Sequence, residues 1–183
     1  LPLQLMRRGK VRELYDAGDG LLLMVASDRA SAFDVILRQP IPMKGEVLTL
    51  LTAWWMEQLG PTVPHHLVAA RPNEILERVP GLRDVPRESW ARRSLLVRRT
   101  RPLPIECVVR GYLAGSGWKE YQQSGTVCGI PLPPGLENCS QLDEPIFTPA
   151  TKEDEGHDIN ISFERMCEII GSDMATELRQ RSM

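Results

Sequence analysis

The residues best suited to bind an anion lie in the string LPIECVVRGYLAGSG, which runs from position 103 to position 117. The apolar residues before Arg110 predict a strand that ends at this arginine, and Ser116 follows six residues later between two glycines at a predicted helix start. Free backbone N–H groups and the helix dipole favour negative charge at such a start. Arg110 and Ser116 therefore predict an anion site, while the string alone also fits a charged strand end and an ordinary N-cap.

A second candidate anion site is the string Gly9-Lys10-Val11-Arg12 near the start of the chain. Glycine lets a backbone approach phosphate groups closely, and the two cations would neutralise their charge. The string is not a Walker A sequence, and a solvated strand end is the alternative interpretation.

Lysine is rare in this chain, because 18 of its 22 basic residues are arginine. The compact ammonium group of lysine and the planar guanidinium of arginine are not interchangeable at phosphate sites. The four lysines are therefore candidates for binding roles, and the alternative is that chance alone left four lysines in the chain. They are Lys10, Lys44, Lys119 and Lys152. For Lys119, a solvated position on a helix is expected.

The elements that must position these residues can be read from hydrophobic patterns. Strand-like runs at 8–16 and 21–26 flank a Gly/Asp turn and predict a β-hairpin. Apolar residues recur at helical spacing over 46–59 and predict a helix that packs on a sheet. Two further strands are predicted at 94–100 and 105–110.

The prolines at 102 and 104 remove two backbone donors and predict a hinge between two lobes. We expect an N-terminal α+β lobe with the hairpin at 1–101 and a second α+β lobe, incomplete at its C-terminus, at 102–183. In the second lobe, helices are predicted at 115–122 and 162–170, with Gly171 as a C-cap and Ser172 as the N-cap of a last helix. That helix has no stop signal, so we expect the sequence to be part of a longer protein.

Composition limits the class of protein. The chain has 183 residues, of which 42% are hydrophobic and 25% charged, and its net charge is -2. No apolar run reaches the roughly 18 to 20 residues of a membrane span, and the first ten residues do not resemble a signal peptide. We therefore expect a cytoplasmic protein without a membrane partner.

Charge and cysteine patterns narrow the class further. The segment 71–101 holds nine arginines and four acids but a single aromatic residue, Trp90. It therefore predicts a solvated basic face or one side of an anion site, and no nucleic-acid partner. The four cysteines are 21, 11 and 28 residues apart, which gives no CxxC pair for zinc or redox chemistry. Reduced and mostly packed thiols are expected.

The motifs resemble those of one family, the phosphoribosylaminoimidazole-succinocarboxamide synthases, or SAICAR synthetases, of purine biosynthesis. Their order and spacing follow the family along essentially the whole chain. Besides the string at 103–117, the matching strings are GKVRELY at 9–15, SDRASAFD at 27–34, IPMKG at 41–45 and FTPATK at 147–152, followed by His157-Asp158.

The resemblance implies a two-lobed α+β fold related to ATP-grasp and kinase-like folds, with ATP in a cleft between the lobes. It also implies a carbon–nitrogen ligase that joins carboxyaminoimidazole ribonucleotide to L-aspartate, through an acyl phosphate, and yields SAICAR, ADP and phosphate. The implied partners are these small molecules with Mg²⁺, and a homo-oligomer is left open.

Site residues follow from the matching positions, and no catalytic residue is named. The residues expected at ATP are Gly9, Lys10, Val11, Arg12, Arg101 and Pro102. The residues expected at the nucleotide or aspartate are Asp34, Lys44, Arg110, Ser116, Lys152, His157 and Asp158. For His157, a loop hydrogen bond is the alternative.

The chain departs from the family in two places. Ile159 stands where the family commonly has a glutamate, which puts any role of that glutamate in doubt. The family's later Asp-x-Lys-x-Glu-Phe-Gly string, with an acidic residue expected to bind Mg²⁺, is absent. Glu106 and Asp158 are the only carboxylates that could be nominated, so no metal ligand is named, the ligands are expected beyond residue 183, and this chain alone is expected to be inactive.

Two other functions remain in competition with the ligase. A catalytically silent nucleotide-binding fragment would keep the binding residues and lack the metal carboxylates. A protein or small-molecule kinase could use the same hairpin and hinge, but the His-Arg-Asp and Asp-Phe-Gly strings of protein kinases are missing. A longer open reading frame with the absent string would separate the ligase from the silent fragment.

Overall fold

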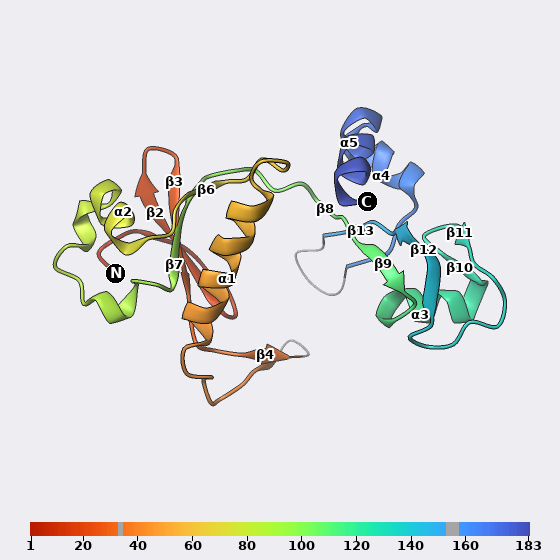
Figure 1. The fold of residues 1–183 in the computed structure, drawn as a ribbon, viewed down its shortest axis with the longest axis horizontal. Helices are drawn as coiled ribbons and strands as arrows, with labels where there is room; N and C mark the ends of the chain where they lie inside the picture. The colour runs from red at the N-terminus through yellow and green to blue at the C-terminus, as the bar shows by residue number, and fades with distance from the viewer. Residues whose placement is uncertain (33–34, 153–157) are drawn as a thin grey trace. The chain divides into compact units, whose positions relative to one another are not determined.

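The computed structural model describes residues 1–32, 35–152 and 158–183. The chain forms two compact units, Leu1–Arg101 and Pro102–Met183 (Figure 1).

The N-terminal unit is built on a five-stranded antiparallel sheet with strand order β1-β2-β3-β7-β6. The predicted hairpin is confirmed: β2 and β3 pair from Arg12↔Ala26 to Gly18↔Leu21, and Asp19 and Gly20 turn the chain with positive φ. The strands are β1 (Leu5–Arg8), β2 (Arg12–Gly18), β3 (Leu21–Ala26), β6 (Leu67–Ala69) and β7 (Ser94–Arg98).

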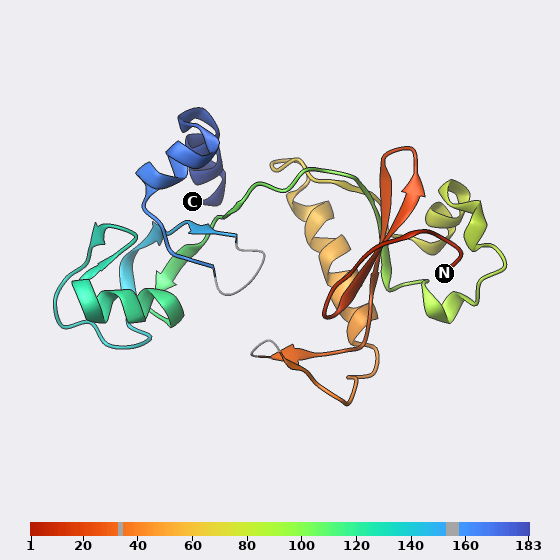
Figure 2. The ribbon, with the colours of Figure 1, turned by 180° about the vertical axis from the view of Figure 1, so that it is seen from behind.

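The two faces of this sheet carry different helices, α1 (Lys44–Leu59) and α2 (Pro72–Arg78). Figures 1 and 2 show them on opposite sides of the sheet. The hydrophobic core lies on the α2 side, where Leu23 and Leu96 pack with Ile75 and Trp90. The alternating pattern of β3 therefore leaves its other face to α1.

The prediction that the apolar stripe of the 46–59 helix packs on the sheet is wrong. The residues that α1 buries are Gly45 and Thr49, whereas Trp54 and Trp55 are 50% and 53% exposed. A Cβ atom at Gly45 would lie 2.8 Å from the carbonyl oxygen of Ala26, so the first turn approaches the sheet too closely for a larger residue. Small residues therefore pack against the sheet, and the large apolar residues of the predicted stripe stay exposed.

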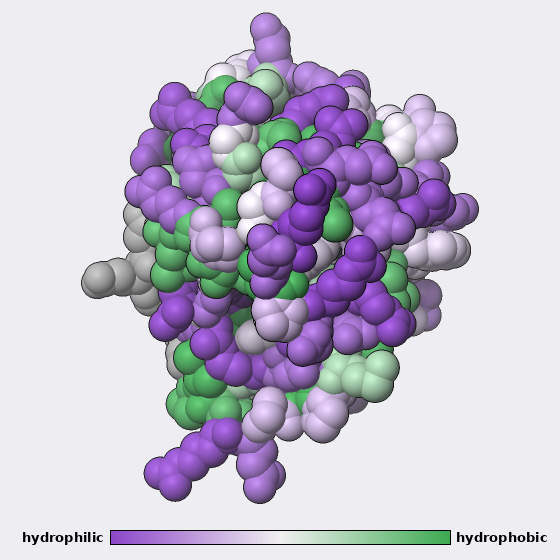
Figure 3. Space-filling view, turned by 90° about the vertical axis from the view of Figure 1, so that its left-hand side faces the viewer, coloured by the Kyte–Doolittle hydropathy of each residue, from purple (hydrophilic) through white to green (hydrophobic). Residues whose placement is uncertain are grey.

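The remaining elements of this unit are short. They are the antiparallel pair β4 (Ser31–Ala32) and β5 (Val35–Ile36), and the 3-10 helices η1 (Pro80–Leu82) and η2 (Arg87–Ser89). Figure 3 views the side of the unit on which α2 lies in Figure 1, and hydrophilic side chains cover most of it. Eight of the nine arginines in 71–101 are exposed, in agreement with the predicted solvated basic face.

The described residues of the C-terminal unit form three two-stranded antiparallel ladders and three helices. The strand predicted over 105–110 is broken into two pieces, because β8 pairs with β13 and β9 pairs with β12. The strands are β8 (Ile105–Glu106), β9 (Val109–Tyr112), β10 (Thr126–Val127), β11 (Ile130–Pro131), β12 (Gln141–Phe147) and β13 (Ala150–Thr151). The helices are α3 (Gly115–Ser124), α4 (Phe163–Ile170) and α5 (Ser172–Ser182).

Two small hydrophobic cores support these elements. One joins β8 and β12 to α4 and α5 around Met166, and the other joins α3 to the β10–β11 hairpin around Leu113 and Val127. The predicted C-cap Gly171 is confirmed with φ 86°. Ser172 is the first residue of α5 and not its N-cap, a position that Gly171 occupies.

Two expectations about the chain as a whole can be compared with the structure. No helix among the described residues is long and apolar enough to cross a bilayer. All four cysteines are free thiols, as predicted, but Cys107 and Cys139 are exposed and only Cys128 is buried. The prediction that most of the thiols are packed is therefore wrong for Cys107 and Cys139.

Candidate active site

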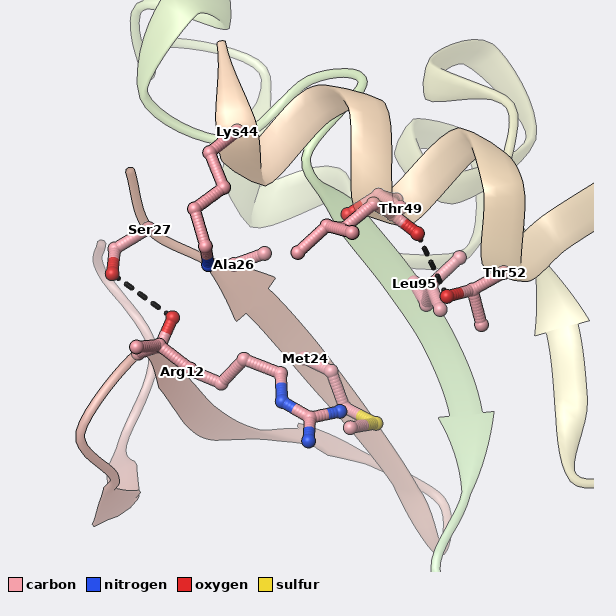
Figure 4. Close-up of a pocket in the computed structure, with 10 residues that line it drawn as sticks. Arg12, Met24, Ala26, Ser27, Lys44, Thr49, Thr52 and Leu95 are labelled. Atoms are coloured by element: carbon pink, nitrogen blue, oxygen red, sulfur yellow. Dashed lines mark hydrogen bonds between the residues drawn. The ribbon is translucent and has the colours of Figure 1, made fainter. Parts of the chain in front are cut away.

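A cavity of about 270 Å³ lies between α1 and the sheet of the N-terminal unit. Its walls include the apolar side chains of Met24, Leu48 and Leu95, and two cations, Arg12 and Lys44, line it as well. Figure 4 shows Arg12 reaching along the sheet toward Met24 and Lys44 reaching from the first turn of α1 toward Ala26. An apolar cavity with two cationic groups can bind a ligand that has a flat apolar part and an anionic part.

The turn before β2 is tied to the end of β3. The N–H of Gly9 donates to the carbonyl of Arg12 at 2.8 Å, and the hydroxyl of Ser27 donates to the carbonyl of Val11 at 2.9 Å (Figure 4). Arg29 donates from Nη2 to the carbonyl of Gly9 at 3.3 Å. These bonds hold the backbone of the predicted phosphate loop in one place.

Asp28 fixes the start of α1, and with it the position of Lys44. Its Oδ1 accepts the N–H of Gly45 at 2.9 Å, and its Oδ2 lies 3.3 Å from Nη2 of Arg93. The N–H of Gly45 and the guanidinium of Arg93 hold the pKa of this carboxyl below its usual value, against a smaller opposing effect of burial. Although Asp28 lies in a matching string, sequence reasoning did not single it out.

Only some of the residues predicted to bind ATP lie at this cavity. Val11 and Arg12 line the cavity, and Gly9 and Lys10 belong to the adjoining turn. Lys44, which was predicted at the nucleotide or aspartate, lines the same cavity as Arg12. Arg101 and Pro102 do not line it and lie where the two units join in sequence.

Arg110 and Ser116 are brought together in the C-terminal unit. The guanidinium of Arg110 donates from Nη2 to Ser116 Oγ at 2.8 Å, from Nε to Thr148 Oγ1 at 3.0 Å and from Nη1 to the carbonyl of Ala114 at 3.2 Å. Thr148 is completely buried and donates to the carbonyl of Val108. Three of the five N–H donors of a guanidinium are thus used to orient it, which leaves two for an anionic ligand.

Gly117 lets this guanidinium lie flat against α3. A Cβ atom at Gly117 would be 3.0 Å from Nε of Arg110 and 3.2 Å from its Cζ. Any side chain at this position would therefore displace the arginine.

The other predicted residues lie elsewhere or outside the described chain. Lys152 follows β13 and forms an ion pair with Glu106 of the paired strand β8, with 2.5 Å between Nζ and Oε1. This ladder is distinct from the β9–β12 ladder that carries Arg110. Asp158 is exposed, and Lys119 is exposed on α3. Asp34 and His157 lie outside the described residues.

Sequence reasoning missed three polar residues around Arg110. They are Thr148, Glu120 and Asn160, which are joined to Arg110 or Ser116 directly or through one another. Thr148 lies within the matching string at 147–152, and Asn160 follows Ile159 directly. Glu120 on its own offered no signal, because a glutamate beside a lysine on a short helix is typical of a solvated surface.

Comparisons with known proteins agree on one family. The family model described as SAICAR synthetase matches residues 5–183. Proteins named phosphoribosylaminoimidazole-succinocarboxamide synthase are similar to the chain, with 55% identity in Methylibium petroleiphilum and 56% in Leptothrix cholodnii. These alignments cover 97% and 99% of the chain but 58% of each relative, so the chain spans about three fifths of their length.

Solved structures agree as well. The SAICAR synthase of Saccharomyces cerevisiae in complex with SAICAR has a TM-score of 0.88 and 41% identity, over 98% of this chain and 60% of that one. A type-2 SAICAR synthetase in complex with ADP has a TM-score of 0.64 at 23% identity, over 96% of this chain and 63% of that one, which supports the fold alone. The mixed α/β fold expected from sequence is that of SAICAR synthases.

Proposed function

Since this chain belongs to the SAICAR synthetase family, we propose that it is the part of such an enzyme that binds ATP and the imidazole nucleotide. The complete enzyme would join carboxyaminoimidazole ribonucleotide to L-aspartate and release SAICAR, ADP and phosphate. The family match over 5–183 and the likeness to a structure that contains SAICAR support this proposal.

The reaction explains why cations are needed at two places. An amine cannot displace an oxygen from a carboxylate, and transfer of a phosphoryl group from ATP makes that oxygen a leaving group. The enzyme must therefore hold a nucleoside triphosphate and two carboxylate substrates close together while it shields their charges. An acyl phosphate is the expected intermediate.

We assign ATP to the cavity between α1 and the sheet. Its apolar walls suit a purine base, and Arg12 and Lys44 suit the phosphate groups. The Gly9–Arg12 turn, held by Ser27 and Arg29, would stay in place when the phosphates bind. We therefore assign Lys44 to ATP, although the sequence placed it among the residues expected at the nucleotide or aspartate. A contact of Arg101 and Pro102 with adenine stays a prediction.

The imidazole nucleotide is assigned to Arg110. Two N–H groups of its guanidinium remain after the internal bonds to Thr148, Ala114 and Ser116, and they can bind a carboxylate or a phosphate. This network is the single structural observation that carries the proposal, because an arginine oriented by three bonds is prepared to bind before the ligand arrives. Contacts of Lys152, His157, Asp158 and Asp34 with the substrates stay predictions.

Mg²⁺ is expected for phosphoryl transfer in this family, but the described residues contain no cluster of metal-ligating side chains. Among them, no three His, Cys, Asp or Glu side chains converge, and the nominated Glu106 is paired with Lys152. No step of the reaction is therefore assigned to a metal bound by this chain.

Three expectations about the wider fold relationship, the location and the assembly of the protein stay predictions. They are the relationship to ATP-grasp and kinase-like folds, a cytoplasmic location, and a homo-oligomer. The silent nucleotide-binding alternative is not favoured, because the relatives over this length are named as synthases.

The proposal is tested in the complete enzyme by measuring SAICAR formation from ATP, carboxyaminoimidazole ribonucleotide and L-aspartate. Arg110→Met should raise the KM for the ribonucleotide about ten- to hundredfold, as expected for one charge-assisted contact. Arg165→Met, on the exposed face of α4, is the matched control and should leave turnover unchanged. An unmodified enzyme that forms no SAICAR would overturn the proposal.

A further inference from the structure

Four polar side chains of the C-terminal unit form a continuous chain of hydrogen bonds. Glu120 of α3 accepts from Asn160 Nδ2 at Oε2, 2.9 Å away, although the two residues are 40 positions apart. The hydroxyl of Ser116 donates to Oδ1 of Asn160 at 3.2 Å, and Arg110 donates to the same hydroxyl oxygen at 2.8 Å. Glu120 is thus connected to Arg110 through Asn160 and Ser116.

The charged groups at the two ends, Arg110 and Glu120, fix which atom donates and which accepts in each of these hydrogen bonds. An ionised carboxylate only accepts hydrogen bonds, so Asn160 must turn its NH₂ group toward Glu120 and its oxygen toward Ser116. The amide oxygen then takes the single proton of the Ser116 hydroxyl. A guanidinium only donates, so Arg110 occupies one of the two lone pairs of the same oxygen. The Ser116 oxygen therefore has one lone pair available to a ligand. Its hydroxyl proton is not available, because Asn160 already accepts it.

Glu120 is itself held in place from its other oxygen. Oε1 accepts the backbone N–H of Cys128 at 2.8 Å, in the turn between β10 and β11. Cys128 has a φ of 53°, so its N–H is aimed by a fixed turn geometry. Burial raises the pKa of the Cys128 thiol to about 11, and the Glu120 carboxylate adds to this rise. Both oxygens of Glu120 therefore have donors, and it cannot rotate away from Asn160 without losing one.

We propose that Glu120 is a positioning residue that acts through Asn160 to make Ser116 a hydrogen-bond acceptor toward the nucleotide substrate. Ser116 would then contact an N–H or O–H group of that substrate, and its anionic groups would be left to Arg110. The inference rests on the proposed function and deepens it, because it divides the expected anion site into one acceptor and one donor position.

The test uses one variant that reverses the donor-to-acceptor direction of these hydrogen bonds and a second variant that restores it. In Glu120→Gln, the new amide oxygen can still accept the N–H of Cys128, but the new NH₂ group then faces Asn160. The amide of Asn160 must therefore rotate by half a turn, so that its own NH₂ group points at Ser116. The proton of Ser116 is then released toward the ligand. In the double variant Glu120→Gln/Asn160→Asp, the new carboxylate accepts both from Gln and from Ser116, so the direction returns with the same total charge.

The readouts are the KM values for the ribonucleotide and for ATP, and the calorimetric Kd of SAICAR, all in the complete enzyme. Glu120→Gln should raise the ribonucleotide KM and the SAICAR Kd about tenfold, equivalent to one hydrogen bond of about 1.4 kcal/mol, with an unchanged KM for ATP. The double variant should recover most of this loss. In a Ser116→Ala background, Glu120→Gln should have no further effect.

Two further variants make the result decisive. Glu168→Gln, the same chemical change on the exposed face of α4, is the control and should resemble the unmodified enzyme. Asn160→Leu breaks the chain without touching the Glu120–Cys128 bond, and it tests the proposal if Glu120→Gln does not fold by circular dichroism. The proposal is overturned if an active enzyme tolerates Asn160→Leu or Glu120→Gln like the control, or if the double variant is no better than Glu120→Gln. Absence of SAICAR formation in the unmodified enzyme would instead contradict the proposed function.

Discussion

Gly45 lies so close to Ala26 that a Cβ atom on the glycine would be 2.8 Å from the alanine's carbonyl oxygen. The contact joins the first turn of α1 to the end of β3, next to the N–H that Gly45 donates to Asp28. Lys44 precedes this glycine, and Arg12 pairs with Ala26 across the hairpin. The close approach therefore sets the distance between the two cations that line the cavity.

Gly45→Ala is expected to destabilise the protein by about 1–3 kcal/mol, because the clashing atom belongs to the backbone and cannot rotate away. Urea denaturation would measure the loss as a lower midpoint at constant slope. Gly81→Ala is the control, since no atom lies within 4 Å of a Cβ built there. Equal midpoints for the two variants would show that α1 can move away from the sheet at little cost.

Lys44→Met should raise the KM for ATP about ten- to hundredfold and leave the KM for the ribonucleotide unchanged, because the lysine shares a cavity with Arg12 and not with Arg110. Arg12→Met should show the same selectivity. Lys119→Met, exposed on α3, provides the comparison. If Lys44→Met instead weakened ribonucleotide or aspartate binding with normal ATP binding, the sequence-based assignment of Lys44 would be right and the present one wrong.

Gly117→Ala should weaken SAICAR binding about tenfold with little loss of stability, because the new methyl group meets the side chain of Arg110 and not the backbone. Calorimetry would give the affinity, and thermal unfolding would show that the fold is intact. Gly111→Ala, where a Cβ would meet nothing within 4 Å, is the control. Unchanged SAICAR affinity in Gly117→Ala would mean that the orientation of Arg110 does not limit binding.

Asp28 should make the stability of the protein depend on pH in the acid range. Its pKa is lowered in the folded state from the ordinary value of 3.8, mainly by the N–H of Gly45 and then by Arg93. The stabilisation is therefore present above about pH 4 and is lost as the pH falls through the lower folded-state pKa. Denaturation at several pH values should show a shallower acid loss for Asp28→Asn than for Asp143→Asn, on an exposed part of β12. Parallel curves for both variants would contradict this role.

Much of the fold follows from local sequence. The β2–β3 hairpin was predictable because alternating residues and a Gly/Asp turn are enough to specify one, and the boundaries of α4 follow from Ser162 and Gly171 at its two ends. Arg110 and Ser116 could be paired in advance, because only a strand end and a helix start separate them. These features depend on neighbours a few residues away.

Other features depend on packing that no local pattern records. The apolar stripe of α1 does not say which side will meet the sheet, and the close approach at Gly45 decided it. Lys44 lies beside Arg12 only because α1 packs across β3. Glu120 contacts Asn160 only because α3 lies beside the segment at 158–161. Sequence determined the residue types and the local elements, whereas the tertiary structure determined which distant side chains share a cavity or a hydrogen bond.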